Sequence, residues 1–468
     1  MRSRKEKRSS KSSKRAKQHR LSLIQEKQTA EIHLAVLKIL GEIGVIVEHR
    51  PTEALLVNHG ATVGGDGYLR IPEAMVAKAI ESVPTELQLY DLSGNIRVNT
   101  GSDIVAYAAG HNCVRTLDFR TKELRSGSLD DIRRTAIVTD ACPNLDMVAS
   151  LGYPTDVPPE DEALETVKAM TANTTKPLAF LAHDDAIQIR IFEHLSDIAG
   201  GKSELADKPF ALELMGPVSP LKLPDELCLR LINCARWGVP VVCYPATFPG
   251  MSCPITTAGA IAQSSAEALA GIIIHQIAEP GSPIMSGSAI LPMDMRQADL
   301  AYGSPEYLVT GLSAADYFQS IGVPTWVGAG CSDSHDFDQQ AAAEAAAGIA
   351  IAALANASFV HNLGFLSGGR TGSIELLVLC DELVGWASQM AAGCTVDADS
   401  IAYEVVKRAA PDNAYLTDDH TQSRYLTENW YPNIFERSDA DAWTERGSQD
   451  LRTRIGSRLE EILAPVGL

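Results

Sequence analysis

Residues 210–244 read FALELMGPVSPLKLPDELCLRLINCARWGVPVVCY, and this stretch carries the repeating unit of the fold. It begins with a short apolar run at 210–215, passes through a helix-compatible segment at 223–237, and ends in a second apolar run at 241–244. Apolar strands joined by a crossover helix pair in parallel, because helices cover both faces of such a sheet. The stretch therefore predicts two parallel strands joined by a helix.

The same unit recurs on both sides of this stretch, between residues 104 and 392. The predicted strands are 104–109, 146–150, 177–182, 210–215, 241–244, 283–288, 325–329 and 358–363. The predicted helices are 129–142, 160–174, 185–199, 223–237, 256–278, 304–321, 337–356 and 372–392. Eight such units close an α/β fold into a (β/α)₈ TIM barrel. A doubly wound open sheet is the alternative, but it needs fewer strands and a Gly-rich turn after the first, and Ala108-Ala109-Gly110-His111 is no G-x-G-x-x-G.

The flanks of the barrel differ from it in pattern. Residues 21–103 predict an N-terminal extension of helices with a small β segment, and residues 393–468 predict a C-terminal helical cap that ends in an amphipathic helix at 451–463. Residues 1–20 hold ten cationic side chains and one acidic side chain, which predicts a disordered basic arm. The domain boundaries expected from sequence are thus 1–20, 21–103, 104–392 and 393–468.

Charge and composition exclude several classes of protein. The arm carries +9 of a net charge of −19, so the remaining 448 residues carry −28, and a body that acidic repels nucleic acid. No segment approaches 18 uninterrupted apolar residues, so no membrane span is expected. The nine cysteines form no C-x-x-C pair, which indicates a reducing cytoplasm.

Chemistry in a TIM barrel lies just after the C-terminal ends of the strands. The residues that follow the predicted strands are rich in polar and aromatic side chains. They include His111, Asn112, Tyr153, His183, Tyr244, Phe248, Ser288, Asp333, His335, His361 and Asn362. Four of the eleven histidines fall in this set, and their convergence on one face of the barrel predicts a site there.

Two kinds of chemistry at these positions are disfavoured. His183 with Asp184, and His335 with Asp333, offer imidazole and carboxylate groups, but no spacing typical of a metal site accompanies them, so no metal is expected. Cys331 could act as a nucleophile if His335 or His361 served as its base, although a packing role is favoured for this thiol.

A Gly-rich turn at 367–373, which contains Gly368, Gly369 and Arg370, leads into the last predicted helix. Backbone N–H groups at a helix start can hold a carboxylate or a phosphate, so a phosphate-binding aldolase or isomerase is an alternative function. Such enzymes use Lys or Glu at a strand end, and none of the strand ends offers a Lys. A plain tight turn remains open as a third interpretation.

Aromatic residues are scarce, at 6%, yet several lie in or just beyond the predicted strands. Inward-pointing rings at a barrel mouth can enclose a quaternary ammonium group by cation–π attraction. The same rings could equally fill the barrel core. These aromatic residues are Tyr107, Tyr153, Phe180, Tyr244, Phe248, Trp326 and Phe365.

Several segments together resemble the trimethylamine methyltransferase family. They are GCSDSHDFDQQ at 330–340, GPVSPL at 216–221, FPGMSCPIT at 248–256, GEIGV at 41–45, and His420-Thr421 with Trp430 and Trp443. The resemblance covers residues 21–468. Founding members of the family carry pyrrolysine, whereas this chain has only standard residues, which places it in the branch associated with quaternary amines such as glycine betaine.

The resemblance implies a methyltransferase that moves a methyl group from a quaternary amine to the Co(I) corrinoid of a partner protein. The corrinoid, of the methylcobalamin type, is expected on that partner or free in solution, and none is expected to bind this chain tightly. A quaternary nitrogen leaves as a neutral tertiary amine, so the enzyme has no proton to deliver to it. A non-catalytic scaffold that binds betaine or corrinoid is the other alternative, and a homo-oligomer is expected.

Roles for the candidate residues follow from their positions and charges. Asp333 and His335 are predicted catalytic residues at the pocket mouth, where a carboxylate offsets the ammonium charge. His111, His361, Asn362 and Arg370 are predicted to bind the substrate carboxylate. The predicted substrate-binding set is His111, Asn112, Tyr153, His183, Tyr244, Phe248, His361, Asn362 and Arg370. The predicted corrinoid-contacting set is Ser288, Gly368 and Gly369.

Overall fold

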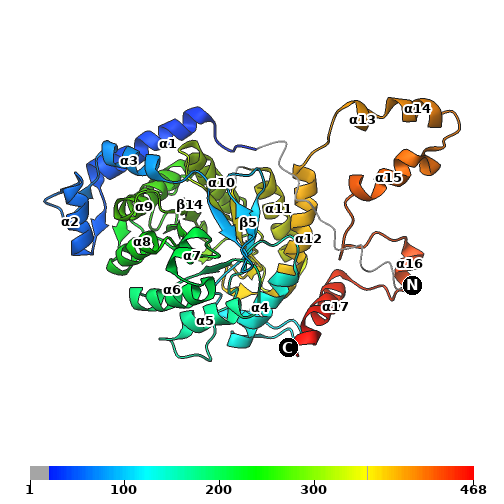
Figure 1. The fold of residues 1–468 in the computed structure, drawn as a ribbon, viewed down its shortest axis with the longest axis horizontal. Helices are drawn as coiled ribbons and strands as arrows, with labels where there is room; N and C mark the ends of the chain where they lie inside the picture. Colours follow the sequence, from blue (N-terminus) through cyan, green and yellow to red (C-terminus); the bar gives the residue numbers. More distant parts are fainter. Residues whose placement is uncertain (1–20, 356, 468) are drawn as a thin grey trace.

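The computed structural model describes residues 21–355 and 357–467 (Figure 1). The predicted basic arm at 1–20 lies outside the described residues. Within them, strands and helices alternate along the chain. The strands form a central parallel sheet, and the helices surround it. The strands of this sheet are β6 (Ala106–Ala109), β9 (Leu178–Phe180), β10 (Ala211–Met215), β12 (Val241–Cys243), β14 (Ile284–Ser286), β18 (Trp326–Gly328) and β19 (Phe359–Leu363).

This central sheet closes into a barrel. Four strands pair in the order β14-β12-β10-β9, and three pair in the order β18-β19-β6. A parallel bridge from Ser286 to Thr325 joins the two groups on one side, and Met147 and Val148 bridge to β6 and β9 on the other. Every pairing in the ring is parallel. The structure therefore confirms the (β/α)₈ barrel and excludes the open sheet.

The second strand is the one place where the barrel departs from the predicted pattern. The sequence predicts a strand at 146–150, but only Met147 and Val148 make bridges there. Asp146 explains part of this difference, because its carboxylate accepts a hydrogen bond from the Tyr107 backbone N–H at 3.0 Å. A side chain thus replaces a ladder partner at the start of the strand.

Eight helices surround the barrel, each one following a strand. Several begin with a polar side chain that accepts a hydrogen bond from an N–H group of the first turn, including those of Asp184, Ser304, Asp338 and Ser373. The helices are α4 (Leu129–Ala141), α5 (Glu162–Thr171), α6 (Asp185–Ala199), α8 (Asp225–Trp237), α9 (Thr257–Ala278), α10 (Pro305–Ser320), α11 (Gln339–Leu354) and α12 (Ile374–Ala391). A short helix, α7 (Lys202–Asp207), lies between α6 and β10.

The N-terminal extension covers α9 on the outside of the barrel. Helix α9 is long and apolar enough to span a membrane by length and composition, yet 78% of its apolar window is buried, and it packs against α1, α3, α8 and α10. The cytoplasmic location expected from the cysteines stays a prediction. The extension contains α1 (Glu26–Lys38), η1 (Ile39–Ile43), β1 (Ile46–Val47), α2 (Arg50–Asn58), β2 (Thr62–Val63), β3 (Leu69–Arg70), α3 (Glu73–Ser82), β4 (Gln88–Tyr90) and β5 (Ile96–Asn99).

Short strands also form within the loops that connect the barrel elements. The Gly-rich turn forms part of a four-stranded sheet with the hairpin that follows β6, in the order β20-β21-β7-β8. These strands are β7 (Arg115–Leu117), β8 (Leu124–Ser126), β11 (Lys222–Leu223), β13 (Ala246–Thr247), β15 (Ala289–Ile290), β16 (Met293–Asp294), β17 (Asp299–Leu300), β20 (Phe365–Leu366) and β21 (Thr371–Gly372).

The C-terminal region has two parts. The final helix lies where the amphipathic pattern predicts it and packs on α4 and α12. The helices before it stand apart from the barrel at the right of Figure 1. The elements of this region are α13 (Ala398–Ile401), α14 (Tyr403–Ala409), η2 (Tyr415–Thr417), α15 (Asp419–Glu428), α16 (Ala440–Glu445), α17 (Leu451–Leu463) and η3 (Ala464–Val466).

Candidate active site in the barrel mouth

A cavity of about 330 Å³ lies at the C-terminal ends of the barrel strands, within the common size range of ligand pockets. None of the described residues that line it is an Asp, Glu, Lys or Arg. The cavity therefore combines apolar and aromatic surface with neutral polar groups. Its lining residues are His111, Asn112, Leu181, Leu214, Met215, Gly216, Tyr244, Ala246, Ala289, Leu291, Tyr302, Tyr307, His361, Asn362, Phe365 and Gly369.

Two histidines stack at the base of this cavity. The rings of His111, which follows β6, and His361, in β19, lie 5.9 Å apart and are parallel to within 4°. Burial lowers the pKa of His111 to about 4, and burial together with the neighbouring His111 lowers the pKa of His361 well below its ordinary value. Both imidazoles are therefore neutral at pH 7, with one donor and one acceptor nitrogen each.

The histidine nitrogens are free to bind a ligand. Neither ring nitrogen of His361 has a protein partner, although its side chain is only 3% exposed. Nε2 of His111, Nε1 of Trp326 and Oη of Tyr107 are also buried without a partner. A buried polar group without a partner costs stability, so such groups mark positions where a ligand or water completes the hydrogen bonding.

Four aromatic rings also line the cavity and form its aromatic wall, and one of them, Phe365, meets the ring of His111 edge-on at 6.3 Å. Tyr302 lies 4.9 Å from Tyr307 and 6.4 Å from Phe365 between ring centroids, and Tyr244 meets the ring of His361 edge-on at 5.3 Å. Burial raises the pKa of all three tyrosines, so their hydroxyl groups stay protonated at neutral pH. The aromatic wall of the cavity presents ring faces and neutral hydroxyl groups.

Glycines at the strand ends make room for these rings. A Cβ at Gly328 would lie 1.8 Å from Tyr307 Oη, and a Cβ at Gly110 would lie 2.0 Å from the ring of Phe365. Any side chain at either position would displace an aromatic ring from the cavity wall. Asn362, in the left-handed conformation at φ 75°, then donates from Nδ2 to Tyr307 Oη at 2.9 Å and fixes that ring.

Asp333 holds the loop that carries Tyr302 and does not line the cavity. Its two carboxylate oxygens accept hydrogen bonds from the N–H groups of Tyr302 and Gly303 at 2.8 and 3.0 Å. Burial raises the pKa of Asp333, and the neighbouring Glu344 adds to this shift. His335 is exposed, and its Nδ1 lies 2.9 Å from Ser367 Oγ. Both residues contact the site through its loops, and their predicted catalytic role stays a prediction.

The Gly-rich turn uses its N–H groups within the protein. Those of Ser367, Gly368 and Gly369 donate to the carbonyl groups of Ser334, Ser332 and Leu366. Gly369 lines the cavity, and a Cβ there would lie 3.3 Å from the Tyr302 ring. The turn therefore packs against the aromatic wall, and its backbone offers no open cradle for an anion.

Arg370 is not among the residues that line the cavity. Its guanidinium forms an exposed ion pair with Asp299 at 2.6 Å and donates from Nε to the Ser367 carbonyl at 3.0 Å. The structure thus places it beside β17 and outside the cavity lining. The predicted contact between Arg370 and the substrate carboxylate stays a prediction, which this arrangement does not favour.

The remaining predicted site residues divide into those inside and those outside the cavity. Asn112 lies inside and is fixed by Ser150, whose hydroxyl donates to Asn112 Oδ1 at 3.0 Å. Tyr153 and His183 lie outside, next to each other, and His183 Nε2 lies 2.7 Å from Glu162 Oε2. Phe248 packs at the edge of the barrel core, and the buried Ser288 Oγ has no partner.

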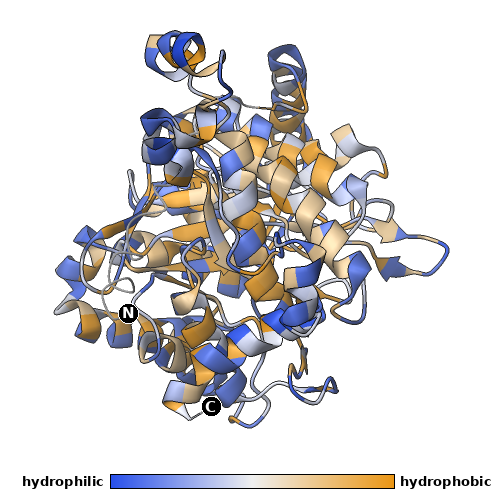
Figure 2. Cartoon of the chain, turned by 90° about the vertical axis from the view of Figure 1, so that its right-hand side faces the viewer, coloured by the Kyte–Doolittle hydropathy of each residue, from blue (hydrophilic) through white to orange (hydrophobic). Residues whose placement is uncertain are grey.

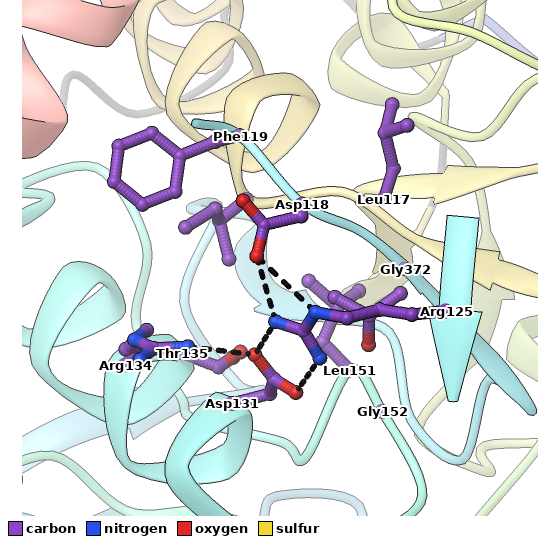
Figure 3. Close-up of a pocket in the computed structure, with 12 residues that line it drawn as sticks. Leu117, Asp118, Phe119, Arg125, Asp131, Arg134, Thr135, Leu151, Gly152 and Gly372 are labelled. Atoms are coloured by element: carbon purple, nitrogen blue, oxygen red, sulfur yellow. Dashed lines mark hydrogen bonds and ion pairs between the residues drawn. The ribbon is translucent and has the colours of Figure 1, made fainter. Parts of the chain in front are cut away.

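A second polar cluster lies beside the barrel, where Arg125 bridges Asp118 and Asp131 (Figure 3). The space among these residues is about 20 Å³, enough for about one water molecule. Arg125 is in β8 and Asp131 is in the first turn of α4, so the cluster fastens the hairpin to the helix. Its role is structural.

Neither a thiol nor a metal cluster competes with this site. Burial raises the pKa of Cys331, so its thiol stays protonated and is a poor nucleophile. All nine cysteines are free. No group of three or more His, Cys, Asp or Glu side chains within 21–355 and 357–467 is arranged to hold a metal ion.

The strand-end rule missed Tyr302 and Tyr307, because neither follows a predicted strand directly. Tyr302 ends the excursion between β15 and α10, and Tyr307 lies in the first turn of α10. One signal was present: Ser304-Pro305 predicts a helix start, and the first turn of a barrel helix faces the barrel mouth. Trp326 and Phe365 were recognised as aromatic candidates.

Comparison with known proteins identifies the family. A family model described as trimethylamine methyltransferase matches residues 1–466. The chain is 27% identical over 450 residues to the glycine betaine methyltransferase of Desulfitobacterium hafniense strain Y51, with 95% of this chain and 92% of the relative covered. It is 27% identical over 458 residues to a trimethylamine methyltransferase of Methanosarcina barkeri, with 95% and 90% covered. This barrel, with its uncharged aromatic cavity, therefore belongs to the trimethylamine methyltransferase family.

Proposed function

We propose that this chain takes a methyl group from a quaternary amine of the betaine type and passes it to a Co(I) corrinoid, carried by a partner protein or supplied free. The observation that carries the proposal is the cavity, which has aromatic faces, neutral hydrogen-bonding groups and no charged residue among its described lining. Family membership supports methyl transfer, and the glycine betaine methyltransferase among the relatives supports the substrate class.

The aromatic wall suits the ammonium end of such a substrate. A quaternary ammonium group cannot donate a hydrogen bond, so ring faces are the groups that recognise it, at roughly 0.5–2 kcal/mol for each ring. Tyr302, Tyr307 and Phe365 supply ring faces next to one another. The tyrosine hydroxyl groups stay neutral and so do not replace this attraction with an ion pair.

The histidine side suits the carboxylate end. His361 lines the cavity and has a free donor nitrogen. It is a neutral donor, and a zwitterionic betaine carries no net charge into the cavity. The uncharged lining therefore matches a substrate with no net charge. Each charged end of that substrate finds its own partners within the cavity.

The leaving group needs no acid from the protein. When the methyl group moves, the C–N bond breaks with its electron pair on nitrogen, and a quaternary amine becomes a neutral tertiary amine. A tertiary amine substrate would need activation, and the cavity lining offers no group that is charged at neutral pH. Positioning and exclusion of water are the contributions expected of the cavity.

The methyl acceptor supplies the nucleophile, since the Co(I) of a reduced corrinoid attacks the methyl carbon. The barrel mouth exposes apolar side chains on which the face of a large ring system can pack. Met251, Ile255 and Met295 are 58–65% exposed there, and a Cβ at Gly250 would meet both Met295 and Ile255. Of the predicted corrinoid contacts, Gly369 reaches the cavity and Ser288 has a free hydroxyl; these roles stay proposals.

The phosphate-binding alternative requires an anion site at the turn before α12, and the described turn does not offer one. The turn before α12 uses its N–H groups internally, and Glu375 in the first turn of α12 is a buried carboxylate paired with Lys122 and Arg452. The two cations near the helix start are thereby already paired with a carboxylate of the protein. A non-catalytic betaine-binding scaffold is separated from the enzyme by the transfer assay described in the Discussion.

A calorimetric titration tests the recognition step. Glycine betaine and 3,3-dimethylbutanoate have the same shape, but the second has a neutral carbon in place of the quaternary nitrogen. We expect betaine-type ligands to bind at least tenfold more tightly, since cation–π attraction to two or three rings exceeds about 1.4 kcal/mol. Equal affinity for the two ligands would contradict the proposed cage.

A matched pair of variants locates the cage. Tyr302→Phe keeps the ring and is expected to bind betaine within about threefold of the parent chain, whereas Tyr302→Ala removes the ring and is expected to lose most of the preference for the charged ligand. If both variants kept the full preference, the ammonium group would bind elsewhere.

A further inference from the structure

Residues 393–432 form an arm that leaves the barrel after α12 and returns before α17 (Figure 1). The structure describes every residue of this arm, and Ala409 is the only buried one. Both ends are fixed to the barrel, since Ala391 and Ala392 are buried and Glu382 accepts hydrogen bonds from the N–H groups of Asn433 and Ile434.

The arm exposes an unusual number of large apolar side chains for so short a segment. Leu416 is 82% exposed, Val396 75% and Tyr403 67%. The full set is Val396, Ile401, Tyr403, Val406, Tyr415, Leu416, Tyr425, Leu426 and Tyr431. Single exposed apolar residues are normal on a protein, but nine in one segment of 40 residues indicate a surface that is covered in the assembled state.

The helices of the arm need an outside surface to be stable. They contain 4, 7 and 10 residues in α13, α14 and α15, and isolated helices shorter than about 12 residues are marginal in water. Helices in proteins gain most of their stability by packing an apolar face. These helices pack no such face on their own barrel.

A second apolar surface, which none of the described residues covers, lies on the barrel next to the root of the arm; we refer to it as the wall. It combines the outer face of α11, where Ala343, Ala347 and Ile351 are exposed at successive turns, with Trp386 and Met390 near the end of α12. Helices α11 and α12 pack side by side. Figure 2 views the molecule from the side that carries the arm, and helices with mostly apolar colouring face the viewer there.

Helix α9 is a similar apolar helix of this fold that is covered on its outer side. Helices α9 and α11 are both rich in Ala and Ile, and Glu344 is the single charged residue of α11. The N-terminal extension covers α9 through α1 and α3. The outer stripe of α11 receives no such cover from the described residues, so it is the equivalent face left open.

The root of the arm lies away from the opening that the methyl acceptor has to reach. Helices in a (β/α)₈ barrel run from the C-terminal face of the sheet back to its opposite face, so the end of α12 and the root of the arm lie at the end of the barrel opposite the cavity. A corrinoid has to reach the cavity mouth. The root of the arm is therefore placed for a different contact.

We propose that two copies of this chain form a two-fold dimer in which the arm of each copy packs on the wall of the other. Each copy has one arm and one wall. When two copies exchange their arms, both arms and both walls are covered. The four arm tyrosines alone expose about 400 Å², half of the about 800 Å² that each partner buries in a stable interface. The leucine, isoleucine and valine side chains bring comparable area.

Light scattering after size-exclusion chromatography tests the dimer. The full chain is expected to have twice its 50.2 kDa mass at about 10 μM, and the arm variant Leu416→Asp/Leu426→Asp is expected to be monomeric. The arm lies outside the core, so this variant should keep the thermal unfolding midpoint of the barrel. The control Ile198→Asp changes an equally apolar exposed residue, 42% exposed on α6, and is expected to remain dimeric. A monomeric parent chain or a dimeric arm variant would overturn the proposal.

Mixing two defective variants tests the exchange itself. The wall variant Ile351→Asp/Met390→Asp is expected to be monomeric alone, because it keeps its arm but cannot receive one. Mixed with the arm variant, it can still place its intact arm on the intact wall of the other chain, so a mixed dimer is expected to form, with weaker affinity than the parent. If the mixture stayed monomeric, or if the wall variant alone formed dimers, the arm would not pack on the wall.

Discussion

His361 is a neutral imidazole, 3% exposed, with neither nitrogen bonded within the protein. If one nitrogen donates to the substrate carboxylate, His361→Ala removes a hydrogen bond to a charged group, worth about 1.5–3 kcal/mol. We expect the KM for a betaine to rise by about tenfold to a hundredfold, and His361→Gln to recover part of that loss. Steady-state methyl transfer with each variant measures this.

Arg370 is the matched control for His361, because it was also predicted from sequence to bind the carboxylate. The structure gives it an exposed ion pair with Asp299, and such pairs contribute about 0–1 kcal/mol. Arg370→Ala is therefore expected to leave the KM within about twofold of the parent value. A large KM rise for Arg370→Ala with none for His361→Ala would reverse the assignment.

The stacked histidines also make stability depend on pH. Their pKa values are lowered by folding, to about 4 for His111, from about 6.5 in the unfolded chain. The unfolded chain then binds more protons as the pH falls below about 6.5, so the free energy of unfolding is full above that pH and decreases toward pH 4. Thermal unfolding between pH 7 and 5 should show a smaller decrease in the double variant His111→Gln/His361→Gln. Parallel pH profiles would mean that these histidines are charged in the folded chain.

At the scale of elements, the loop 291–303 is held over the cavity by Asp333, through the N–H groups of Tyr302 and Gly303. Asp333→Ala leaves these groups without their acceptor and frees the loop that carries Tyr302. We expect a higher KM together with faster tryptic cleavage after the exposed Arg296 in the same loop. The control Asp294→Ala removes a surface pair with Arg296 and the hydrogen bond from the Arg296 N–H, but no contact to Tyr302, so it should leave the KM unchanged. A cleavage rate unchanged in Asp333→Ala would show that the loop is fixed in another way.

Local patterns were enough to predict the barrel elements, and long-range contacts explain what they missed. The apolar runs predicted the position of all eight strands, but the second is shorter than predicted, and there the Asp146 carboxylate accepts a hydrogen bond from the Tyr107 N–H, 39 residues away. The strand-end rule found His111, Asn112, Tyr244, His361 and Asn362 in the cavity. It could not show that Asp333 turns toward a loop 30 residues earlier, or that Arg370 pairs with Asp299, because both contacts depend on how separate loops meet.

At the scale of the whole molecule, the cavity and the arm lie at opposite ends of the barrel, so they are expected to be independent. Replacing residues 393–432 by a flexible Gly/Ser linker of about eight residues should remove the dimer contact and leave betaine affinity within about twofold. The thermal unfolding of the barrel should also be retained, because the arm buries only Ala409. Loss of betaine binding in this variant would show that dimer contacts shape the cavity.

The acidic body and the uncharged cavity act at different ranges. Residues 21–468 carry a net charge of −28, which favours the approach of cationic solutes, although salt screens this field over about 8 Å. Inside the cavity the described lining carries no charge, so selectivity there rests on ring faces and neutral donors. A zwitterion, which has no net charge, suits this uncharged lining better than a simple cation does.

Methyl transfer itself is followed most directly by the visible spectrum of the corrinoid. The full chain is mixed with a free corrinoid reduced to Co(I), and glycine betaine or its tertiary counterpart dimethylglycine is added. The expected result is conversion of the Co(I) spectrum to that of a methylated corrinoid with the quaternary amine and none with the tertiary amine, and a much slower conversion with His361→Ala. No conversion with any quaternary amine, or equal conversion with dimethylglycine, would contradict the proposed reaction.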